Sequence, residues 1–234
     1  MASSRAAARR PSQLSDELRE RYKRAAARAA AEMIGEGMRV GLGTGTTVAH
    51  LLPAIAERGE LNLRCVATSP ATEDAARALG LRVERLDELG GLDIAIDGTD
   101  QVDAAGWLVK GGGGALTREK IVAAAASVFV VIASEDKAVR ELSPPVPLEI
   151  LRFGARSTLG LVGQAALRDT PESPDGGVIA DYNGPIGDPR ELSARLSATP
   201  GVVDHGLFAP ELVSLILIAG AAGIERRAGG KPLD

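Results

Sequence analysis

The sequence predicts an α/β fold: a doubly wound, mostly parallel sheet of Rossmann-like type, joined to a second, smaller α+β domain of ferredoxin-like type. Between residues 14 and 133, short β-rich runs alternate with alanine-rich stretches suited to helices, an order typical of a parallel sheet covered by helices. The run at residues 128–133 is apolar throughout, as expected for a strand buried on both faces. Prolines at residues 143–147 separate this pattern from the next one.

Composition places the chain among globular proteins and excludes several function classes. Its 234 residues suffice for one large domain or for one domain with a smaller cover. The net charge of -4 and the aromatic content of 3% argue against a nucleic-acid-binding surface. No apolar run approaches the roughly 20 residues of a membrane span. Because Cys65 is the only cysteine, no intramolecular disulfide can form, and the chain fits a reducing cytoplasm.

The larger domain is expected to comprise residues 13–143 and 209–234, after a disordered tail at residues 1–12. Helices are expected at residues 14–34, 48–55, 72–79 and 118–126, the last with Thr117 as its N-cap. Strands are expected at residues 38–42, 63–67, 81–86, 92–96 and 128–133. Residues 212–219 are apolar enough to return as a strand of this domain, and residues 225–234 are expected to be a polar tail.

The smaller domain, residues 144–208, is expected to act as a lid or in oligomerisation. Strands are expected at residues 148–152, 178–182 and 202–208, and helices at residues 157–167 and 189–198. A Pro/Gly-rich, hairpin-like loop is expected at residues 170–177.

Residues 110–120 carry the strongest chemical signal. Four consecutive glycines follow Lys110, so the backbone N–H groups can approach a ligand closely. Glu119 falls in the first turn of the next helix, where the helix dipole favours an ionised carboxylate that can accept a proton. Asp97 and Asp100 follow the strand just upstream. A surface loop with solvated charges would explain any one of these residues, but their combination favours a site.

A second glycine loop, residues 43–47, lies between a strand and an apolar helix, an arrangement that binds phosphate. Thr46 replaces the third glycine of a dinucleotide fingerprint, and no Gly-Lys-Ser/Thr follows, so neither a dinucleotide nor a nucleotide P-loop is indicated. Ser69 stands where a nicotinamide-binding fold would place an acid. A small phosphorylated ligand fits better, with the hydroxyls of Thr44, Thr46 and Thr47 as donors.

These candidates are expected to meet at the carboxyl ends of the parallel strands, where Thr44, Ser69, Asp97 and Lys137 emerge. Lys23 lies among arginines on the first helix, and from the residues alone a solvated basic face is the favoured interpretation. The remaining candidates are expected to be structural, with no metal-ligand spacing: His50, His205, Trp107 and Cys65.

Five motifs in register give the chain a marked resemblance to a known family. They are Val40-Gly-Leu-Gly-Thr-Gly-Thr-Thr47, Thr68-Ser69, Asp93-Ile-Ala-Ile-Asp-Gly-Thr-Asp100, Lys110-Gly-Gly-Gly-Gly-Ala-Leu-Thr-Arg-Glu-Lys120 and Pro147-Leu-Glu149. The chain resembles ribose-5-phosphate isomerase, type A, continuously from about Lys23 to Phe153 and more weakly to Phe208. The resemblance implies interconversion of ribose 5-phosphate and ribulose 5-phosphate in the pentose phosphate pathway, without metal or organic cofactor, by a cytoplasmic homodimer or homotetramer.

The resemblance also implies roles for individual residues. Glu119 would be the general base that moves a proton between C2 and C1 through a cis-enediolate, and Lys110 would stabilise the oxyanion. Asp97 and Asp100 would hold sugar hydroxyls and assist ring opening. Substrate contacts are implied for Lys23, Thr44, Gly45, Thr46, Thr47, Ser69, Gly98, Thr99, Gly111, Gly112, Gly113 and Lys137, of which Lys23 and Lys137 would supply positive charge.

The chain departs from the family pattern in three places. Where the family usually reads Asp-Gly-Ala-Asp-Glu, this chain has Thr99 and Gln101 in place of the alanine and glutamate, so substrate affinity or rate is expected to be altered. The Asp-Asn-Gly-Asn stretch of the smaller domain is here residues 181–185, Asp-Tyr-Asn-Gly-Pro. The usual Ala-Asp is absent around residues 211–214, which bears on lid geometry and oligomer contacts.

Three alternatives remain open from the sequence. A non-catalytic sugar-phosphate sensor would need a DNA-binding segment, for which the short N-terminus leaves no room. An acyl-CoA transferase would use a glutamate nucleophile, but it calls for a larger chain or a partner subunit. An isomerase of a different sugar phosphate is the third alternative, since Thr99 and Gln101 bear on the pocket.

Overall fold

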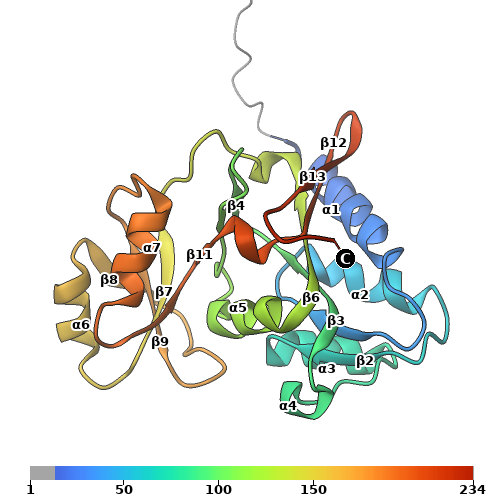
Figure 1. Cartoon of the computed structure of the whole chain (residues 1–234), viewed down its shortest axis with the longest axis horizontal. Helices are drawn as coiled ribbons and strands as arrows, with labels where there is room; N and C mark the ends of the chain where they lie inside the picture. The colour runs from blue at the N-terminus through green and yellow to red at the C-terminus, as the bar shows by residue number, and fades with distance from the viewer. Residues whose placement is uncertain (1–13, 234) are drawn as a thin grey trace, which may run out of the picture.

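The computed structural model describes residues 14–233, so the tail expected at residues 1–12 lies outside the described residues. A large sheet and a small antiparallel sheet form two neighbouring units with a short three-stranded sheet between them (Figure 1). The helices are α1 (Asp16–Ala31), α2 (Val48–Ala56), α3 (Pro70–Ala78), α4 (Leu86–Leu89), α5 (Leu116–Ala125), α6 (Ala155–Val162) and α7 (Pro189–Ser197), with 3-10 helices η1 (Glu135–Lys137) and η2 (Pro210–Leu212).

The large sheet has the strand order β13-β12-β6-β3-β1-β2. Its members are β1 (Arg39–Leu42), β2 (Arg64–Ala67), β3 (Leu92–Gly98), β6 (Ala126–Ser134), β12 (Leu215–Gly220) and β13 (Gly223–Ala228). All neighbouring pairs are parallel except β12 with β13. The expected doubly wound, mostly parallel sheet is therefore confirmed.

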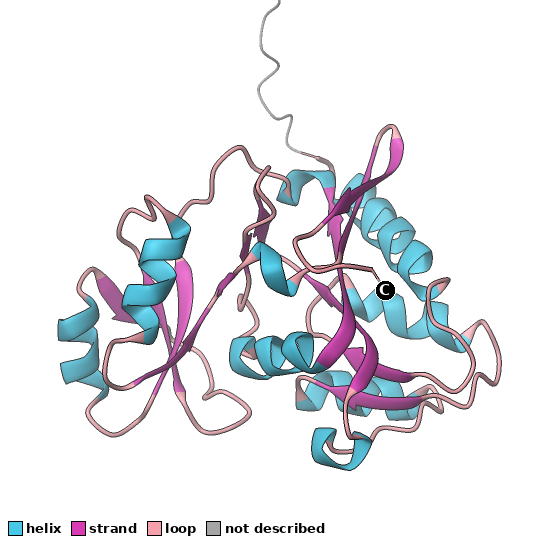
Figure 2. Cartoon of the chain, viewed as in Figure 1, coloured by secondary structure: helices cyan, strands magenta, loops and turns pink. Residues whose placement is uncertain are grey.

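Helices cover both faces of this sheet, because successive side chains of a strand point to opposite faces (Figure 2). Along β6, Val130 and Ile132 pack in one cluster with the apolar faces of α1 and α2. Phe129 and Val131 pack in a second cluster with Val122 of α5 on the other side. Strand β6 is thus buried on both faces, as its unbroken apolar sequence predicts.

The small sheet has the order β10-β7-β9-β8, and every neighbouring pair in it is antiparallel. Its strands are β7 (Val146–Ile150), β8 (Ala165–Leu167), β9 (Val178–Tyr182) and β10 (Val202–His205). With α6 after β7 and α7 after β9, the chain order is βαββαβ, which is the ferredoxin-like arrangement. We call this unit the small domain.

A three-stranded sheet, β11-β5-β4, joins the two units. It consists of β4 (Gln101–Val102), β5 (Leu108–Val109) and β11 (Leu207–Phe208). The single strand expected at residues 202–208 is wrong, because the chain turns at Gly206 between β10 and β11, which lie in different sheets. A Cβ at Gly206 would lie 2.1 Å from the carbonyl oxygen of Lys110, so only glycine permits this close approach.

Four other sequence-based assignments need correction. Residues 81–86 form only an isolated bridge, from Val83 to Cys65, before α4. The helix expected at residues 157–167 ends at Val162, because Gly163 takes a positive φ of 66° and the chain then enters β8. The polar residues after Gly223 form the edge strand β13 rather than a tail. Thr117 is not an N-cap, since α5 begins at Leu116 after Ala115.

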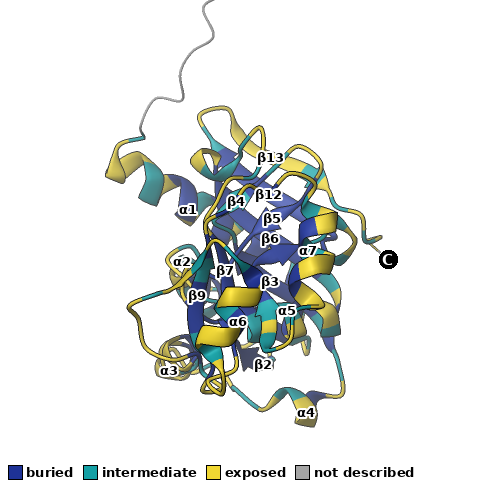
Figure 3. Cartoon of the chain, turned by 90° about the vertical axis from the view of Figure 1, so that its left-hand side faces the viewer, coloured by how far each residue is buried: buried dark blue, intermediate teal, exposed yellow. Residues whose placement is uncertain are grey.

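Burial follows the layers of the fold, with dark strands between helices whose outward faces are exposed (Figure 3). Trp107 and Cys65 are buried in packing positions, and burial raises the pKa of the Cys65 thiol to about 12. His50 Nε2 lies 2.7 Å from Glu20, and His205 Nδ1 accepts the backbone N–H of Leu207 at 3.2 Å, so both histidines have structural partners. None of the described helices combines the length and apolar composition that a membrane span requires.

Candidate active site

A cavity of about 270 Å³ lies where the loops after β1, β3 and β5 meet the start of α5 and the 3-10 helix η1. Because β1, β3 and β6 are parallel, their carboxyl ends share one edge of the sheet and bring these segments together. The lining residues are Thr44, Gly45, Thr46, Thr47, Gly98, Thr99, Asp100, Lys110, Gly111, Gly112, Gly113, Glu119 and Lys137. All of them are candidates named from the sequence.

Two carboxylates and one ammonium form the buried centre of this site. Lys110 Nζ lies 3.0 Å from Asp97 Oδ2 and 3.2 Å from Glu119 Oε2, and it donates to the carbonyl oxygen of Gly98 at 2.5 Å. The three charged residues are 2% to 4% exposed. Two negative charges therefore share one positive charge almost out of contact with water.

Hydrogen bonding distinguishes the two carboxylates. Asp97 Oδ1 accepts the backbone N–H groups of Thr44 at 3.1 Å and Gly98 at 2.7 Å. Asp97 Oδ2 and Glu119 Oε2 accept no hydrogen bond within residues 14–233, so only the Lys110 ammonium compensates them there. Asp97 is thus fixed from two sides and lies beneath the cavity, whereas Glu119 is held less tightly and lines it.

Burial is also the main cause of the shifted pKa values at this centre. It raises the pKa of Glu119 to about 7, and the Asp97 charge raises it further while Lys110 opposes the shift. Burial likewise raises the pKa of Asp97, against the effect of Lys110. For Lys110, burial lowers the pKa, but the two carboxylates outweigh it, so the net shift is upward and the ammonium stays charged. Glu119 can therefore gain and lose a proton near neutral pH.

A pH profile follows from the raised pKa of Glu119. A base must be deprotonated in the free protein, so kcat/KM is expected to fall as pH drops through about 7. Since the Asp97 charge raises this pKa, Asp97→Asn is expected to move the acid limb to lower pH. Steady-state kinetics between pH 5 and 9 would measure the acid limb of the unmodified protein and that of the variant. An acid limb near the ordinary glutamate pKa in the unmodified protein would contradict this prediction.

Glycines are required where the backbone passes these carboxylates. A Cβ at Gly43 would lie 2.0 Å from the Asp97 carboxyl group, and a Cβ at Gly112 would lie 3.0 Å from that of Asp100. Gly112 N instead donates to Asp100 Oδ2 at 2.9 Å. Both glycine loops can therefore lie directly against the acidic side chains.

Arg168 of the small domain is a contact that the sequence analysis missed. Its guanidinium donates to the carbonyl oxygens of Gly111 at 3.2 Å and Gly112 at 3.0 Å. Two further bonds, of 2.9 and 2.5 Å, join it to Asp181. Arg168 belongs to none of the glycine motifs and precedes the Pro/Gly-rich loop at residues 170–177, so nothing local in the sequence singles it out.

Besides Asp97, which lies beneath the cavity, two candidates lie outside its lining. Ser69 is buried at the start of α3, where its hydroxyl accepts the N–H of Thr72 at 3.2 Å. Lys23 is also buried, so the solvated basic face favoured from the residues alone is wrong. Its ammonium lies 2.6 Å from Glu20. Neither residue is among those that line the cavity.

At the two positions near β4 that depart from the family pattern, the side chains form hydrogen bonds with backbone groups. Thr99 Oγ1 can donate to the carbonyl oxygens of Gln101 at 2.7 Å and Val109 at 3.0 Å. Gln101 both donates to the carbonyl oxygen of Ser143 and accepts its N–H, each at 2.8 Å. A glutamate at position 101 could make only the second of these bonds. The amide therefore fastens β4 to the segment that enters the small domain.

Gln101→Glu is expected to affect stability more than activity. The carboxylate would face the Ser143 carbonyl without a proton to share, so the variant loses one solvent-exposed hydrogen bond, which costs about 0.5–1.5 kcal/mol of unfolding free energy. Thermal melting and turnover of the same preparation would measure the two effects. Loss of turnover with an unchanged melting temperature would contradict the assignment and place Gln101 among the groups that act on the ligand.

The fold and the site together define a class of protein: an α/β protein that holds a proton acceptor beside an ammonium in a water-poor cavity next to a phosphate-suited loop. A family model described as ribose 5-phosphate isomerase A (phosphoriboisomerase A) matches residues 64–223. The chain belongs to this family, and the resemblance noted in its motifs is confirmed.

Curated relatives agree with the family model. The protein named ribose-5-phosphate isomerase A from Rhodopseudomonas palustris (strain BisB5) is 42% identical over 225 residues, covering 88% of this chain and 97% of the relative. The protein of the same name from Synechococcus sp. (strain JA-3-3Ab) is 43% identical over 222 residues, covering 88% and 96%. The similarity therefore extends through both units of the fold.

Solved structures extend the similarity to three dimensions. Ribose 5-phosphate isomerase A from Neisseria gonorrhoeae superposes with a TM-score of 0.84 at 32% identity, covering 90% of this chain and 97% of that one. The enzyme from Methanocaldococcus jannaschii gives a TM-score of 0.84 at 32% identity, covering 89% and 99%.

Proposed function

We propose that this chain interconverts D-ribose 5-phosphate and D-ribulose 5-phosphate, as the names of its relatives indicate for those proteins. The observation that carries the proposal is the pairing of Glu119 with Lys110 at 3.2 Å in the wall of the cavity. An aldose-ketose isomerisation needs one base that reaches two adjacent carbons and one cation for the oxygen that becomes charged. This pair supplies both.

Proton transfer by Glu119 gives a balanced sequence. Its carboxylate removes the proton from C2 of the open-chain aldose, and the electron pair forms the C1–C2 double bond. The C1 carbonyl oxygen becomes the enediolate oxyanion, which the Lys110 ammonium stabilises. A hydroxyl proton moves from the oxygen on C2 to that on C1, and Glu119 returns its proton to C1, leaving the ketone at C2. Asp100, which lines the cavity, holds a sugar hydroxyl and assists ring opening; the same role for Asp97, which lies beneath the cavity, is assigned by family resemblance only.

Substrate binding divides between the two glycine loops. The hydroxyls of Thr44, Thr46 and Thr47 and the N–H groups at the start of α2 suit a phosphate, and Lys137 adds positive charge at the same cavity. The Gly111–Gly113 backbone lies over the sugar. Lys23 is assigned to the phosphate by family resemblance only, because in this structure it pairs with Glu20.

Turnover of ribose 5-phosphate by purified, chelator-treated protein tests this function, with formation of the ketose followed directly. A panel of other aldose phosphates would separate this reaction from an isomerase of a different sugar. The proposal predicts the highest kcat/KM for ribose 5-phosphate. Binding of ribose 5-phosphate without turnover would favour the sensor alternative.

We further propose that the protein acts in the pentose phosphate pathway of the cytoplasm as a homodimer or homotetramer, with residues 144–208 serving as a lid and in oligomer contacts. Apolar side chains on this part of the surface support a role in assembly: Phe153 is 94% exposed, Leu161 63% and Leu151 55%. Sedimentation velocity would give the mass in solution. A monomer at micromolar concentration would contradict the proposed assembly.

A further inference from the structure

The first turn of α5 is fastened to the small domain on both sides of Glu119. Glu119 turns toward Lys110 and the cavity, whereas its polar neighbours Thr117, Arg118 and Lys120 all reach the small domain. The contacts are Thr117 Oγ1 to Glu149 Oε2 at 2.5 Å, Arg118 to both carboxylate oxygens of Asp175 at 2.8 and 2.7 Å, and Lys120 Nζ to Asp204 Oδ1 at 2.5 Å. The proposed base therefore lies on a helical turn whose neighbouring side chains bond to the small domain.

Glu149 makes the least expected of these contacts. It lies on β7, is 3% exposed and forms no ion pair within the described residues. Hydroxyl groups satisfy its two oxygens instead: Thr117 donates to Oε2, and Ser173 donates to Oε1 at 2.5 Å. The Ser173 hydroxyl in turn accepts the N–H of Gly177 at 3.0 Å. A chain of hydrogen bonds thus runs from the 170–177 loop to α5.

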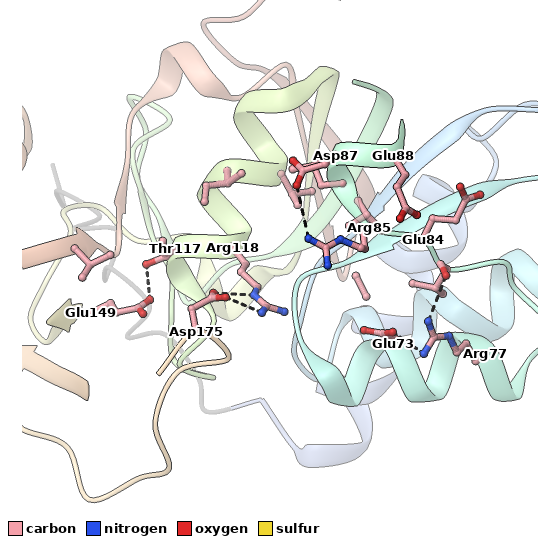
Figure 4. A pocket seen from close by; sticks show the side chains of 17 residues that line it. Glu73, Arg77, Glu84, Arg85, Asp87, Glu88, Thr117, Arg118, Glu149 and Asp175 are labelled. Carbon is pink, nitrogen blue, oxygen red and sulfur yellow. Dashed lines mark hydrogen bonds and ion pairs between the residues drawn. The ribbon is translucent and has the colours of Figure 1, made fainter. Parts of the chain in front are cut away.

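A buried carboxylate without a cation costs free energy that a neutral side chain would avoid. Part of that cost is offset because Glu149 lies at the N-terminal end of α5, where the helix dipole is positive. A Cβ at Gly177 would lie 2.3 Å from Glu149 Oε1, so the loop packs directly on the carboxylate. Figure 4 shows Thr117 and Glu149 facing each other in the wall of a second cavity, of about 750 Å³, on the other side of α5.

We propose that Glu149 is a positioning residue, which fixes the first turn of α5 through Thr117 and so sets the place of Glu119 relative to Lys110. The inference rests on the proposed isomerase function. Glu119 Oε2 accepts no hydrogen bond within residues 14–233, so its position depends on the backbone that carries it and on the Lys110 contact alone. Thr117 lies two residues earlier on the same helical turn, so its restraint passes directly to Glu119.

The test is Thr117→Val, which keeps the shape of the side chain but removes the hydroxyl. A small displacement of a reacting group costs up to about 10²-fold in rate, so kcat is expected to fall about tenfold or more while KM stays within about twofold. Thr117→Ser retains the hydroxyl and is expected to restore kcat. Glu149→Met keeps a similar volume and removes both acceptor oxygens, so it should lower kcat by several-fold and serves if Thr117→Val fails to fold.

Thr158→Val is the matched control. Thr158 is a buried threonine of α6 whose hydroxyl donates to the carbonyl oxygen of Pro200 at 3.1 Å. This hydrogen bond does not involve α5. Thr158→Val should lower the melting temperature and leave kcat unchanged. If the wild type is active and kcat is unchanged in both Thr117→Val and Glu149→Met, the inference is wrong while the proposed function stands. An equal loss of kcat in Thr158→Val would have the same meaning. An inactive wild type would overturn the proposed function and this inference with it.

Discussion

Replacing Glu119 with glutamine is expected to lower kcat by about 10²- to 10⁴-fold, the usual contribution of a general base, and to leave KM within a few-fold. Glutamine matches the shape of glutamate but cannot take the proton from C2. It also removes one of the two negative charges beside Lys110, so the variant should fold at least as stably as the parent. Steady-state kinetics and thermal melting of the same preparation measure both expectations.

Glu73→Gln is the control for this substitution, because Glu73 lies on α3 and pairs with Arg77 at the surface. It should leave kcat unchanged. Near-full turnover by the Glu119 variant would remove Glu119 from the role of base, whatever its place in the cavity.

Replacing Lys110 with methionine is expected to affect stability as well as activity. Without the ammonium, Asp97 and Glu119 face each other buried and uncompensated, and breaking a buried pair in this way costs about 3–5 kcal/mol of unfolding free energy. Protonation of a carboxyl group would remove the repulsion between the two charges, so the pKa of Glu119 is expected to rise further. The enediolate oxygen also loses its cation, so kcat should fall by about 10²-fold or more.

Chemical denaturation at pH 8, followed by kinetics at a temperature where the variant is folded, would separate the two effects of Lys110→Met. A matched surface variant is Arg226→Met, since Arg226 is exposed on the edge strand β13 and does not line the cavity. A Lys110 variant that unfolds at the same denaturant concentration as the parent would show that the ammonium does not compensate the two carboxylates.

Local sequence was sufficient to predict the elements whose ends are marked by the residues around them. Apolar strands such as β6 and β9, and the glycine loops after β1 and β5, could be placed from composition alone. The carboxyl-edge rule for parallel strands predicted that Thr44, Ser69, Asp97 and Lys137 meet, and of these Thr44 and Lys137 line the cavity. The positions of these residues follow from the local sequence and one topological rule.

Long-range contacts account for what the sequence could not reveal. The polar strand β13 exists only because it pairs with β12, and the break at Gly206 depends on a close approach to Lys110. Arg168 reaches the glycine loop from the small domain, 56 or 57 residues away along the chain. Lys23 is likewise buried on α1, whose apolar residues pack in one cluster with those of α2. No local sequence pattern predicts these contacts.

The position of α5 ties the small domain to Glu119. Figure 1 shows α5 between the large sheet and the small domain. Its apolar residues pack on the large sheet, whereas its first turn bonds to β7, β10 and the 170–177 loop. Movement of the small domain would therefore move Glu119 as well.

The most direct test of proton transfer by Glu119 is isomerisation of ribose 5-phosphate in D₂O, with the product analysed by NMR. A carboxylate base that carries the proton between carbons exchanges it with solvent in part of the turnovers. We predict ribulose 5-phosphate with deuterium at C1, formed by the wild type and not by Glu119→Gln. Ketose formed at full rate with no deuterium, or by both proteins alike, would contradict the proposed mechanism.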